Sequence, residues 1–324
     1  MRLPRSLVLR RIALRCSSFP IAQLFRVPVI ARSVKYRLSV EDSIMPKSNR
    51  RRMPFYLRDE PKPQHDIRLL RPRSLPLGER FETLEDVEKY SRDSEEKLAL
   101  SDCREDLRLA NDLSECRTSD RGCGLPSCPI CARLFRIWFI SELLRIVEKV
   151  GADQVRIETI LLAQAPHDQI DSLDVKGYDA LLRKRLNRNG LADAAIIGGY
   201  ENIYRAKLKI WMMHLNLVII GGNVEAIRAF ENTFSKSQLQ KPTMLQTLED
   251  FKRQLSYILK FTTYHRPFTQ RGSTKSTPVP LNPREHCALV SWMAQWKFQD
   301  FIFLFNARRE GATIVSRAGS RLAF

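Results

Sequence analysis

The sequence predicts a domain of mixed helices and strands, an α+β or α/β sandwich around a small sheet. Stretches with a helical period alternate with a few apolar stretches of strand length. The chain is 44% hydrophobic, which allows a buried core. It contains no run of about eighteen apolar residues, so we expect no transmembrane helix.

Most of the positive charge lies at the amino-terminal end. Residues 1–75 hold 18 Lys and Arg against 5 Asp and Glu, whereas the net charge of the whole chain is +18. We expect a basic, largely disordered segment over 1–77 and a folded domain over 78–324. Residues 1–40 contain eight Arg, one Lys and no acid, which resembles a mitochondrial transit peptide. The alternatives are an over-extended start before Met45 and a basic arm that contacts nucleic acid.

The expected elements follow one another from residue 78. A polar helical pattern covers 78–115, and the apolar spacing of 132–149 indicates a strongly amphipathic helix. Further helices are expected over 173–188, 223–234, 244–263 and 284–297, and strands over 154–163, 194–204 and 208–222. A short polar turn joins the last two strands and indicates a hairpin.

Five of the seven cysteines lie within 29 residues. The segment CRTSDRGCGLPSCPIC holds Cys116, Cys123, Cys128 and Cys131, with Gly and Pro residues that supply tight turns. A Cys-x-x-Cys turn directs two thiolates to one point, and two more complete a tetrahedral zinc site. We therefore expect a structural Zn²⁺ in a four-cysteine knuckle over 116–131 and a reducing compartment. The alternative is a set of unrelated buried thiols.

The segment WMMHLNLVII, residues 211–220, is an apolar strand that carries two polar residues. Because side chains alternate along a strand, His214 and Asn216 share one face. Polar groups in a buried strand need partners. Either internal hydrogen bonds satisfy this pair or the pair binds a ligand.

The preceding strand, IIGGYENIY, supplies Glu201. In one of the possible hairpin registers its carboxylate reaches the face of His214 and Asn216, although the sequence does not fix the register. An imidazole, a carboxylate and a side-chain amide would suit Mn²⁺ or Mg²⁺, with waters in the remaining positions.

The segment TLEDFKRQLSYILKFTTYHRP has an apolar helical face, and Tyr257 lies opposite that face. Arg253 and Lys260 fall on the neighbouring turns, at i−4 and i+3. Such cations would lower the cost of forming a phenolate and hold an anionic phosphate, so Tyr257 is a candidate nucleophile. The alternative is a surface tyrosine on a solvated helix.

These motifs follow one another as zinc cysteines, a Gly-Tyr-Glu strand, a Trp-x-x-His-x-Asn strand and a Tyr-x-x-Lys segment. In this order they resemble the rolling-circle replication initiators, which are Rep proteins of the HUH endonuclease superfamily, of the bacterial plasmid and mobile-element type. The resemblance covers about residues 110–265. CPIC resembles the family's cysteine segment, WMMHLNLVIIGG its metal strand and YILK its nucleophile motif. Asn216 stands where the family has a second histidine, so the metal motif is degenerate.

The resemblance implies an α+β fold in which a small antiparallel sheet is flanked by helices and the metal strand is central. It also implies a DNA-nicking replication initiator that acts on single-stranded or origin DNA. His214, Asn216 and Glu201 would hold a catalytic Mg²⁺ or Mn²⁺. Tyr257 would attack the phosphodiester while Lys260 steadies the phosphate, leaving a 5′-phosphotyrosyl link and a free 3′-OH.

The function that competes with this one is a zinc-stabilised DNA-binding protein that has lost nicking activity. The N-terminus alone suggests a third, an organellar or ribosome-associated basic protein. A covalent DNA adduct separates the first from the other two. The resemblance implies a bacterial cytoplasmic protein, with mitochondrial targeting by residues 1–40 as the alternative localisation.

Overall fold

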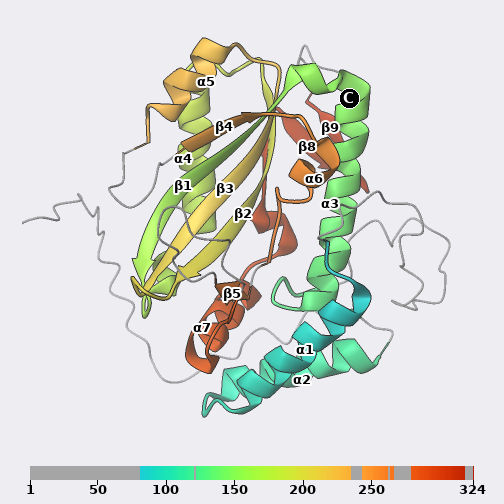
Figure 1. The fold of residues 1–324 in the computed structure, drawn as a ribbon, viewed down its shortest axis with the longest axis vertical. Helices are drawn as coiled ribbons and strands as arrows, with labels where there is room; N and C mark the ends of the chain where they lie inside the picture. Colours follow the sequence, from blue (N-terminus) through green and yellow to red (C-terminus); the bar gives the residue numbers. More distant parts are fainter. Residues whose placement is uncertain (1–80, 120–121, 235–242, 262, 266–278, 318–323) are drawn as a thin grey trace, which may run out of the picture. The chain divides into compact units, whose positions relative to one another are not determined.

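The fold is a five-stranded antiparallel sheet with helices on both of its faces (Figure 1). A computed structural model describes residues 81–119, 122–234, 243–261, 263–265, 279–317 and 324. All of them lie in the second of the two units of the chain, Ser48–Phe324. The basic segment predicted over 1–77 falls outside the described residues. The expected α+β class, with a small antiparallel sheet flanked by helices, is confirmed.

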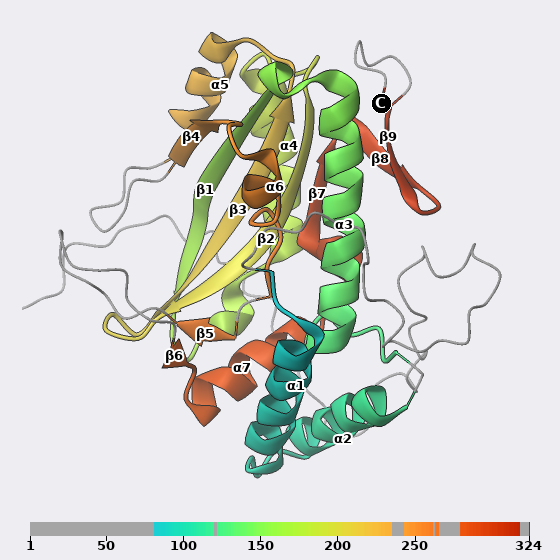
Figure 2. The same cartoon turned by 45° about the vertical axis from the view of Figure 1, so that its right-hand side comes forward.

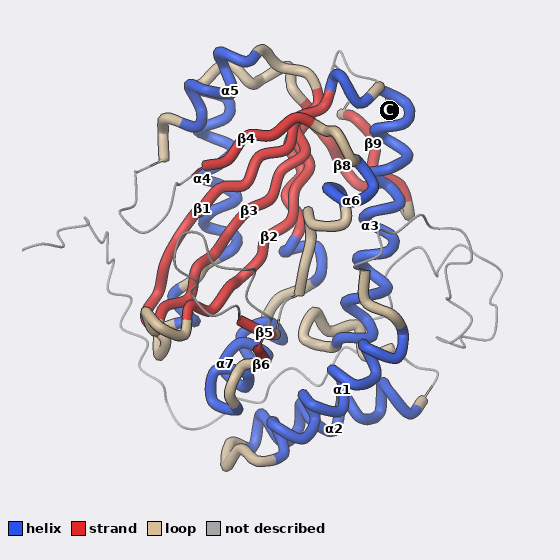
Figure 3. Tube along the Cα trace, viewed as in Figure 1, coloured by secondary structure: helices blue, strands red, loops and turns tan. Residues whose placement is uncertain are grey.

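The sheet has the strand order β4-β1-β3-β2-β7, and every neighbouring pair is antiparallel (Figure 3). The strands are β1 (Val155–Pro166), β2 (Ala195–Arg205), β3 (Ile210–Ile220), β4 (Thr243–Thr247) and β7 (Ile302–Phe305). β3 is central, and each of its residues after Ile210 is buried. A strand that is covered on both faces needs apolar side chains in both directions, which explains its continuous apolar run.

The helices form two layers around the sheet (Figure 2). α3 (Pro129–Val150) and α6 (Phe251–Leu255) lie on one face, and α4 (Val175–Arg188) and α5 (Val224–Glu231) lie on the other. The buried side chain of Tyr200 on β2 points to the α4 side, because the charges of Asp179 and Arg183 on α4 act on its hydroxyl. Residues at alternate positions of β2, such as Glu201, therefore point to the α3 side.

Three further helices pack at the end of the sheet near the β2–β3 turn. They are α1 (Leu84–Ala99), α2 (Arg104–Thr118) and α7 (Pro283–Ala294). Buried polar contacts hold them together, since His286 of α7 lies 3.0 Å from the Ser94 hydroxyl of α1. The hydroxyl of Tyr204 on β2 donates to Glu285 of α7 at 3.2 Å, which ties this helical group to the sheet.

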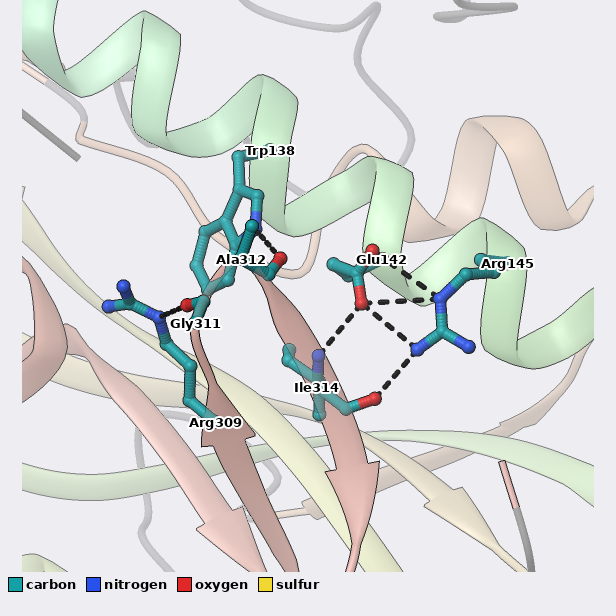
Figure 4. A network of polar contacts seen from close by, with 7 residues as sticks. All are labelled: Trp138, Glu142, Arg145, Arg309, Gly311, Ala312 and Ile314. Atoms are coloured by element: carbon teal, nitrogen blue, oxygen red, sulfur yellow. Dashed lines mark hydrogen bonds and ion pairs between the residues drawn. The ribbon is translucent and has the colours of Figure 1, made fainter. Parts of the chain in front are cut away.

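The carboxy-terminal strands β8 (Ala307–Glu310) and β9 (Thr313–Ser316) form a hairpin that docks on α3 (Figure 4). Nε1 of Trp138 donates to the Ala312 carbonyl at 2.5 Å. The carboxylate of Glu142 accepts the Ile314 N–H at 2.8 Å, and Arg145 donates to the Ile314 carbonyl at 2.6 Å. These contacts fix the hairpin on α3, because each one joins a side chain of α3 to the backbone of the hairpin.

Most of the predicted elements are found within a few residues of their expected bounds. The polar helical pattern over 78–115 forms two helices, with a break between Ala99 and Arg104. One prediction is wrong. The helix predicted over 244–263 is mostly absent: residues 243–247 form edge strand β4 and only Phe251–Leu255 is helical. The side chain of Asp250 caps this short helix by accepting the Arg253 N–H at 3.1 Å. Within the described part of the chain, no helix is long and apolar enough to cross a membrane.

Candidate functional site

Four cysteine sulfurs converge where α2 meets α3. Cys116 lies in the last turn of α2, Cys123 in the connecting loop, Cys128 at the N-cap of α3 and Cys131 in its first turn. All four Sγ atoms lie within 4.8 Å of one another. The loop reverses sharply at Gly124, whose φ of 70° is in the left-handed region that glycine adopts without strain.

The geometry of this cluster suits a tetrahedral metal ion. The Sγ of Cys116 lies 3.6 Å from those of Cys128 and Cys131, and Cys123 lies 3.7 Å from Cys131. These distances are far longer than the roughly 2 Å of a disulfide bond. They are close to the separation of about 3.8 Å expected for thiolates that each lie about 2.3 Å from one Zn²⁺. The cluster could therefore hold a metal ion and is compatible with structural zinc.

The surroundings of the cysteines favour a thiolate at Cys116, whereas hydrogen bonds with Cys116 and burial raise the pKa of Cys128 and Cys131. The backbone N–H of Cys123 donates to Cys116 Sγ at 3.3 Å, and the N–H of Gly124 donates to Cys131 Sγ at 3.4 Å. Hydrogen bonds from the neighbouring thiols also hold the pKa of Cys116 far below its usual value. Since metals bind the deprotonated sulfur, these donors lower the cost of loading the site.

A second polar group lies in the centre of the sheet, on the face that α3 covers. The β2–β3 register places Glu201 directly opposite His214 and Gly199 opposite Asn216. This is the register in which the Glu201 carboxylate reaches the face of the two polar residues of β3. Glu201, His214 and Asn216 are each at least nine-tenths buried.

Asn216 is hydrogen-bonded through both ends of its amide. Its Oδ1 accepts from the Thr159 hydroxyl of β1 at 2.9 Å, and its Nδ2 donates to Glu201 Oε2 at 3.4 Å. An amide oxygen and a carboxylate can each accept more than one partner. Both oxygens therefore keep capacity for a cation, although the amide is already satisfied without one.

His214 is less fully satisfied than Asn216. Among the described residues, its buried Nδ1 has no hydrogen-bond partner. Burial lowers its pKa, and the charges of Arg205 and Lys260 act in the same direction against the opposing charge of Glu201. His214 is therefore neutral near pH 7, which is the form that binds metals. An imidazole, a carboxylate and an amide oxygen are donor types that Mn²⁺ or Mg²⁺ accepts.

The chain segment after α6 crosses the sheet directly above this polar group. A Cβ atom on Gly199 would lie 2.6 Å from the Ile258 carbonyl oxygen and 3.0 Å from Leu259 Cα. Only glycine leaves room for so close an approach of backbone to the sheet. On the other side of the segment, Arg136 of α3 donates to the carbonyls of Leu259 and Ser256. The segment is therefore clamped between β2 and α3.

Tyr257 and Lys260 both lie on this clamped segment. The prediction that both lie on one helix is wrong, because the helix ends at Leu255 and Tyr257 lies in the following turn. The two side chains still meet: Lys260 Nζ lies 3.7 Å from the centroid of the Tyr257 ring. Arg253, the other predicted neighbour, is exposed. Tyr257 and Lys260 are therefore neighbours as predicted, but they meet on the segment that follows α6 and not on a helix.

The structure brings the predicted residues together in two groups. Tyr257 and Lys260 line a cavity of about 340 Å³ between α1, the cysteine loop and the start of α3. His214, Glu201 and Asn216 form the other group, in the sheet beside Gly199 and beneath the segment after α6. They do not line that cavity. Lys260 connects the two, since it covers the Tyr257 ring and its charge acts on His214.

Sequence reasoning missed Thr159 and Arg136. Thr159 gave no signal because its contact with Asn216 depends on the β1–β3 register. Arg136 is one of two buried arginines of α3, a helix that is buried over most of its surface, so its position has no periodic signature. Its burial together with its bonds to distant carbonyls marks it as a positioning residue.

The fold and this site define an α+β protein with a four-cysteine centre that could hold a metal ion and a polar group buried in the middle of its sheet. Comparisons with family models, curated proteins and solved structures give no match to this chain.

Proposed function

We propose that this protein nicks single-stranded DNA as a replication initiator of the HUH type and that its four-cysteine knuckle binds a structural Zn²⁺. The observation that carries the proposal is the alignment of Glu201 with His214 on the two central strands, beneath the segment that bears Tyr257 and Lys260. A catalytic carboxylate–imidazole pair on rigid central strands is held in place by the sheet ladder, which suits precise positioning of a phosphate.

His214, Glu201 and Asn216 are the residues that would hold a divalent ion. Such an ion, when bound, would polarise the scissile phosphate. The other tasks belong to the protein. Asn216 orients the Glu201 carboxylate through its Nδ2, and Thr159 fixes the Asn216 amide. The donor chemistry of the group thus accounts for an asparagine in an otherwise apolar strand.

Tyr257 is the proposed nucleophile. Its phenolic oxygen loses its proton and forms a bond to phosphorus, and the bond between phosphorus and the 3′ oxygen breaks. The leaving 3′ oxygen takes up a proton, so the products are a 5′-phosphotyrosyl link and a free 3′-OH. The ammonium group of Lys260, which lies against the Tyr257 ring, favours the phenolate and the negatively charged phosphate.

A DNA-binding protein without nicking activity is the second candidate function, and two observations favour it. Asn216 is satisfied by protein partners alone, at 2.9 Å and 3.4 Å. Tyr257 lines a cavity that His214, Glu201 and Asn216 do not line. In this case the same fold and the basic charge of the chain would serve binding to a polyanion only.

A labelled-strand assay tests the first function. The full chain is incubated with a pool of single-stranded oligonucleotides and Mn²⁺, and a protein–DNA band that resists denaturant is sought. We expect a 3′-end label to stay with the protein and a 5′-end label to leave it, because the tyrosine takes the 5′ phosphate. Absence of the band with every pool would favour the second candidate.

Three tyrosine variants make the assay specific. Tyr257→Phe should abolish the adduct and keep DNA binding, whereas Tyr178→Phe, a half-buried tyrosine on α4, should leave the adduct unchanged. An adduct that survives Tyr257→Phe and disappears in Tyr264→Phe would show that the nucleophile lies seven residues further along the chain.

A further inference from the structure

The helix α4 concentrates positive charge in a part of the chain that is otherwise close to neutral. The described residues contain 28 Lys and Arg against 29 Asp and Glu. In the 14 residues of α4, by contrast, there are five cations and one acid. The cations are Lys176, Arg183, Lys184, Arg185 and Arg188. The charge of α4 is therefore a local feature and not a share of a generally basic domain.

Two of the five cations are already paired. Arg183 donates from Nε and Nη2 to the carboxylate of Asp179, at 2.7 and 3.3 Å, and so occupies the one acid of the helix. Nζ of Lys176 lies 3.7 Å from the carboxylate of Asp300. Among the described residues, the other three cations form no ion pair. We call these three the α4 cation cluster, and they are Lys184, Arg185 and Arg188.

Two members of the cluster lie on the side of α4 that faces away from the sheet. The buried residues of the helix are Val175, Leu182 and Leu186, which form one stripe. At about 100° per residue, Lys184 lies about 180° from Val175, and Arg188 lies about 40° further round the helix. Both cations are exposed. Their charged ends are therefore accessible to a large partner.

Arg185 extends the cluster toward α5. Its guanidinium lies 4.7 Å from the centroid of the Phe234 ring, which follows α5 in the chain. Burial lowers the pKa of Arg185, and no carboxylate charge opposes this effect. The ring positions the guanidinium but does not neutralise it. α5 itself, the other helix on this face of the sheet, carries only one net negative charge.

Helix stability explains only part of the cluster. Arg185 and Arg188 lie in the last turn of α4, where cations interact favourably with the negative end of the helix dipole. Lys184 precedes that turn and lies four residues before Arg188. Like charges at this spacing destabilise a helix. An exposed arrangement that lowers helix stability indicates an anion outside the protein.

The exposed side of α4 suits a phosphate backbone better than unpaired bases. Besides cations, its exposed residues are Gly177, Ala180, Leu181 and Asn187, and none of them is aromatic. Proteins commonly hold single-stranded nucleic acid by stacking its bases on aromatic rings. A duplex presents regularly spaced phosphates and keeps its bases stacked inside, so cations are sufficient to bind it.

We propose that the α4 cation cluster binds the phosphate backbone of duplex DNA, on the face of the sheet opposite to α6 and the segment that bears Tyr257 (Figure 2). The choice of a polyanion rests on the charge of α4, and the choice of DNA rests on the proposed function. The protein then holds the duplex beside the nick site on one face of its sheet and the single strand on the other.

Binding of the full chain to a short DNA duplex at several salt concentrations tests this inference. The variant is Lys184→Gln/Arg188→Gln, and comparison with wild type cancels the contribution of the basic residues 1–75. Each lost phosphate contact should lower the slope of log affinity against log salt by about 0.9. The double variant should therefore lose about 1.8 in slope and bind at least about tenfold more weakly near 0.1 M salt. An unchanged slope would overturn the site.

The matched control is Lys89→Gln/Arg108→Gln. It removes the same two charges from exposed positions on α1 and α2, which are acidic helices. This control should keep the wild-type slope. Equal losses in the two double variants would mean that the net charge of the protein sets the affinity, and they would overturn the assignment to α4. Melting curves should coincide for all three proteins, because every substituted side chain is exposed.

Two further ligands test the kind of partner. The same proteins are titrated with single-stranded poly-deoxythymidylate and with vesicles that contain phosphatidylserine. We expect the α4 substitutions to weaken duplex binding more than single-strand binding. An equal loss for the single strand would overturn the assignment to a duplex. A loss confined to the vesicles would overturn nucleic acid as the partner.

The outcome is separable from that of the proposed function. The α4 double variant keeps Tyr257 and Lys260, so it should form the covalent adduct with single-stranded oligonucleotides as wild type does. Tyr257→Phe should bind the duplex normally and form no adduct. Duplex binding that depends on α4, in a protein that never forms an adduct, would leave the α4 cation cluster standing and the nicking proposal refuted. An adduct in a protein whose duplex binding ignores α4 would do the reverse.

Discussion

The Thr159 hydroxyl donates to the side-chain oxygen of Asn216 across the β1–β3 pair, at 2.9 Å. This bond explains how a buried strand tolerates an asparagine, and it defines what a histidine at the same position would change. Asn216→His replaces a satisfied amide with a larger imidazole, directly beneath the segment that covers Gly199. Without metal we expect the variant to lose about 1–3 kcal/mol of stability through overpacking.

With Mn²⁺ the same variant should recover. Imidazole nitrogen is a better donor than an amide oxygen for Mn²⁺ and later first-row metals, so the metal should raise the melting temperature of Asn216→His more than that of the wild type. His214→Ala should remove the response in both backgrounds. A variant that melts lower and gains nothing from Mn²⁺ would mean that the group is structural.

The β2–β3 hairpin was predictable because its signals are local. An apolar run of strand length that follows a polar turn is enough to predict the strand, and the alternation of strand side chains then places His214 and Asn216 on one face. The four-cysteine cluster was predictable for a similar reason, since its four cysteines all lie in one stretch of 16 residues that contains tight turns. Short sequence separation leaves few arrangements to choose from.

The segment 244–263 was not predictable by the same means. Its apolar spacing is helical, and Leu255, Ile258 and Leu259 are indeed buried, but only the first of them is in a helix. Residues 243–247 instead pair with residues 156–160 of β1, a contact between distant parts of the chain. A free sheet edge competes with helix propensity there, and no local pattern reports it.

The four-cysteine knuckle should contain about one zinc ion per chain. Cys131→Ser should abolish zinc binding and destabilise the α2–α3 junction, because three sulfurs cannot complete the tetrahedral site. Cys103→Ser changes an exposed thiol outside the cluster and is the control. Metal analysis of freshly purified protein checks the first point and chelator-dependent melting checks the second. Zinc-free wild-type protein that melts normally would contradict both.

Gly199 should be intolerant of a side chain. Gly199→Ala drives Cβ against the Ile258 carbonyl and Leu259 Cα, which are backbone atoms that cannot rotate away. We expect a loss of about 1–3 kcal/mol and displacement of the segment that carries Tyr257. Gly177→Ala on α4 is the control, because its new Cβ meets only side-chain atoms of Asp174, the N-cap of that helix, and no backbone atom. That control should change stability by less than about 1 kcal/mol, since the helix propensity of alanine offsets a weakened cap.

Urea unfolding of both variants measures the difference. Protection of the Ile258 and Leu259 amides from hydrogen exchange reports the segment itself. An unchanged free energy of unfolding for Gly199→Ala would show that the segment does not rest on the sheet in solution.

Glu158 of β1 is fully buried on the α5 side of the sheet, between Leu217 and Leu245 of the neighbouring strands. Among the described residues, neither of its carboxylate oxygens has a hydrogen-bond partner. Burial, helped by the charge of Glu231, raises its pKa from 4.5 to about 8. The folded protein therefore holds this carboxyl in its neutral form near pH 7.

This raised pKa makes stability depend on pH in a definite direction. Below pH 4.5 the carboxyl is protonated in both states and costs nothing through ionisation. Between pH 4.5 and about 8 only the unfolded chain ionises, so the free energy of unfolding falls by roughly 1.4 kcal/mol per pH unit from this group. Above pH 8 the folded state ionises as well and the loss levels off.

Glu158→Gln removes the ionisation and keeps the shape, and Glu158→Leu also removes the unpaired polar atoms. Relative to wild type, both variants should become progressively more stable as pH rises from 5 to 8, with Glu158→Leu the more stable of the two. Glu148→Gln, on the exposed side of α3, should follow the wild-type curve. Urea unfolding at pH 5, 6, 7 and 8 measures all four proteins, and using the difference from wild type cancels the titration of other groups. If the wild-type and Glu158→Gln curves run parallel across this range, Glu158 is ionised in the folded protein and must have a charged or hydrogen-bonding partner in solution.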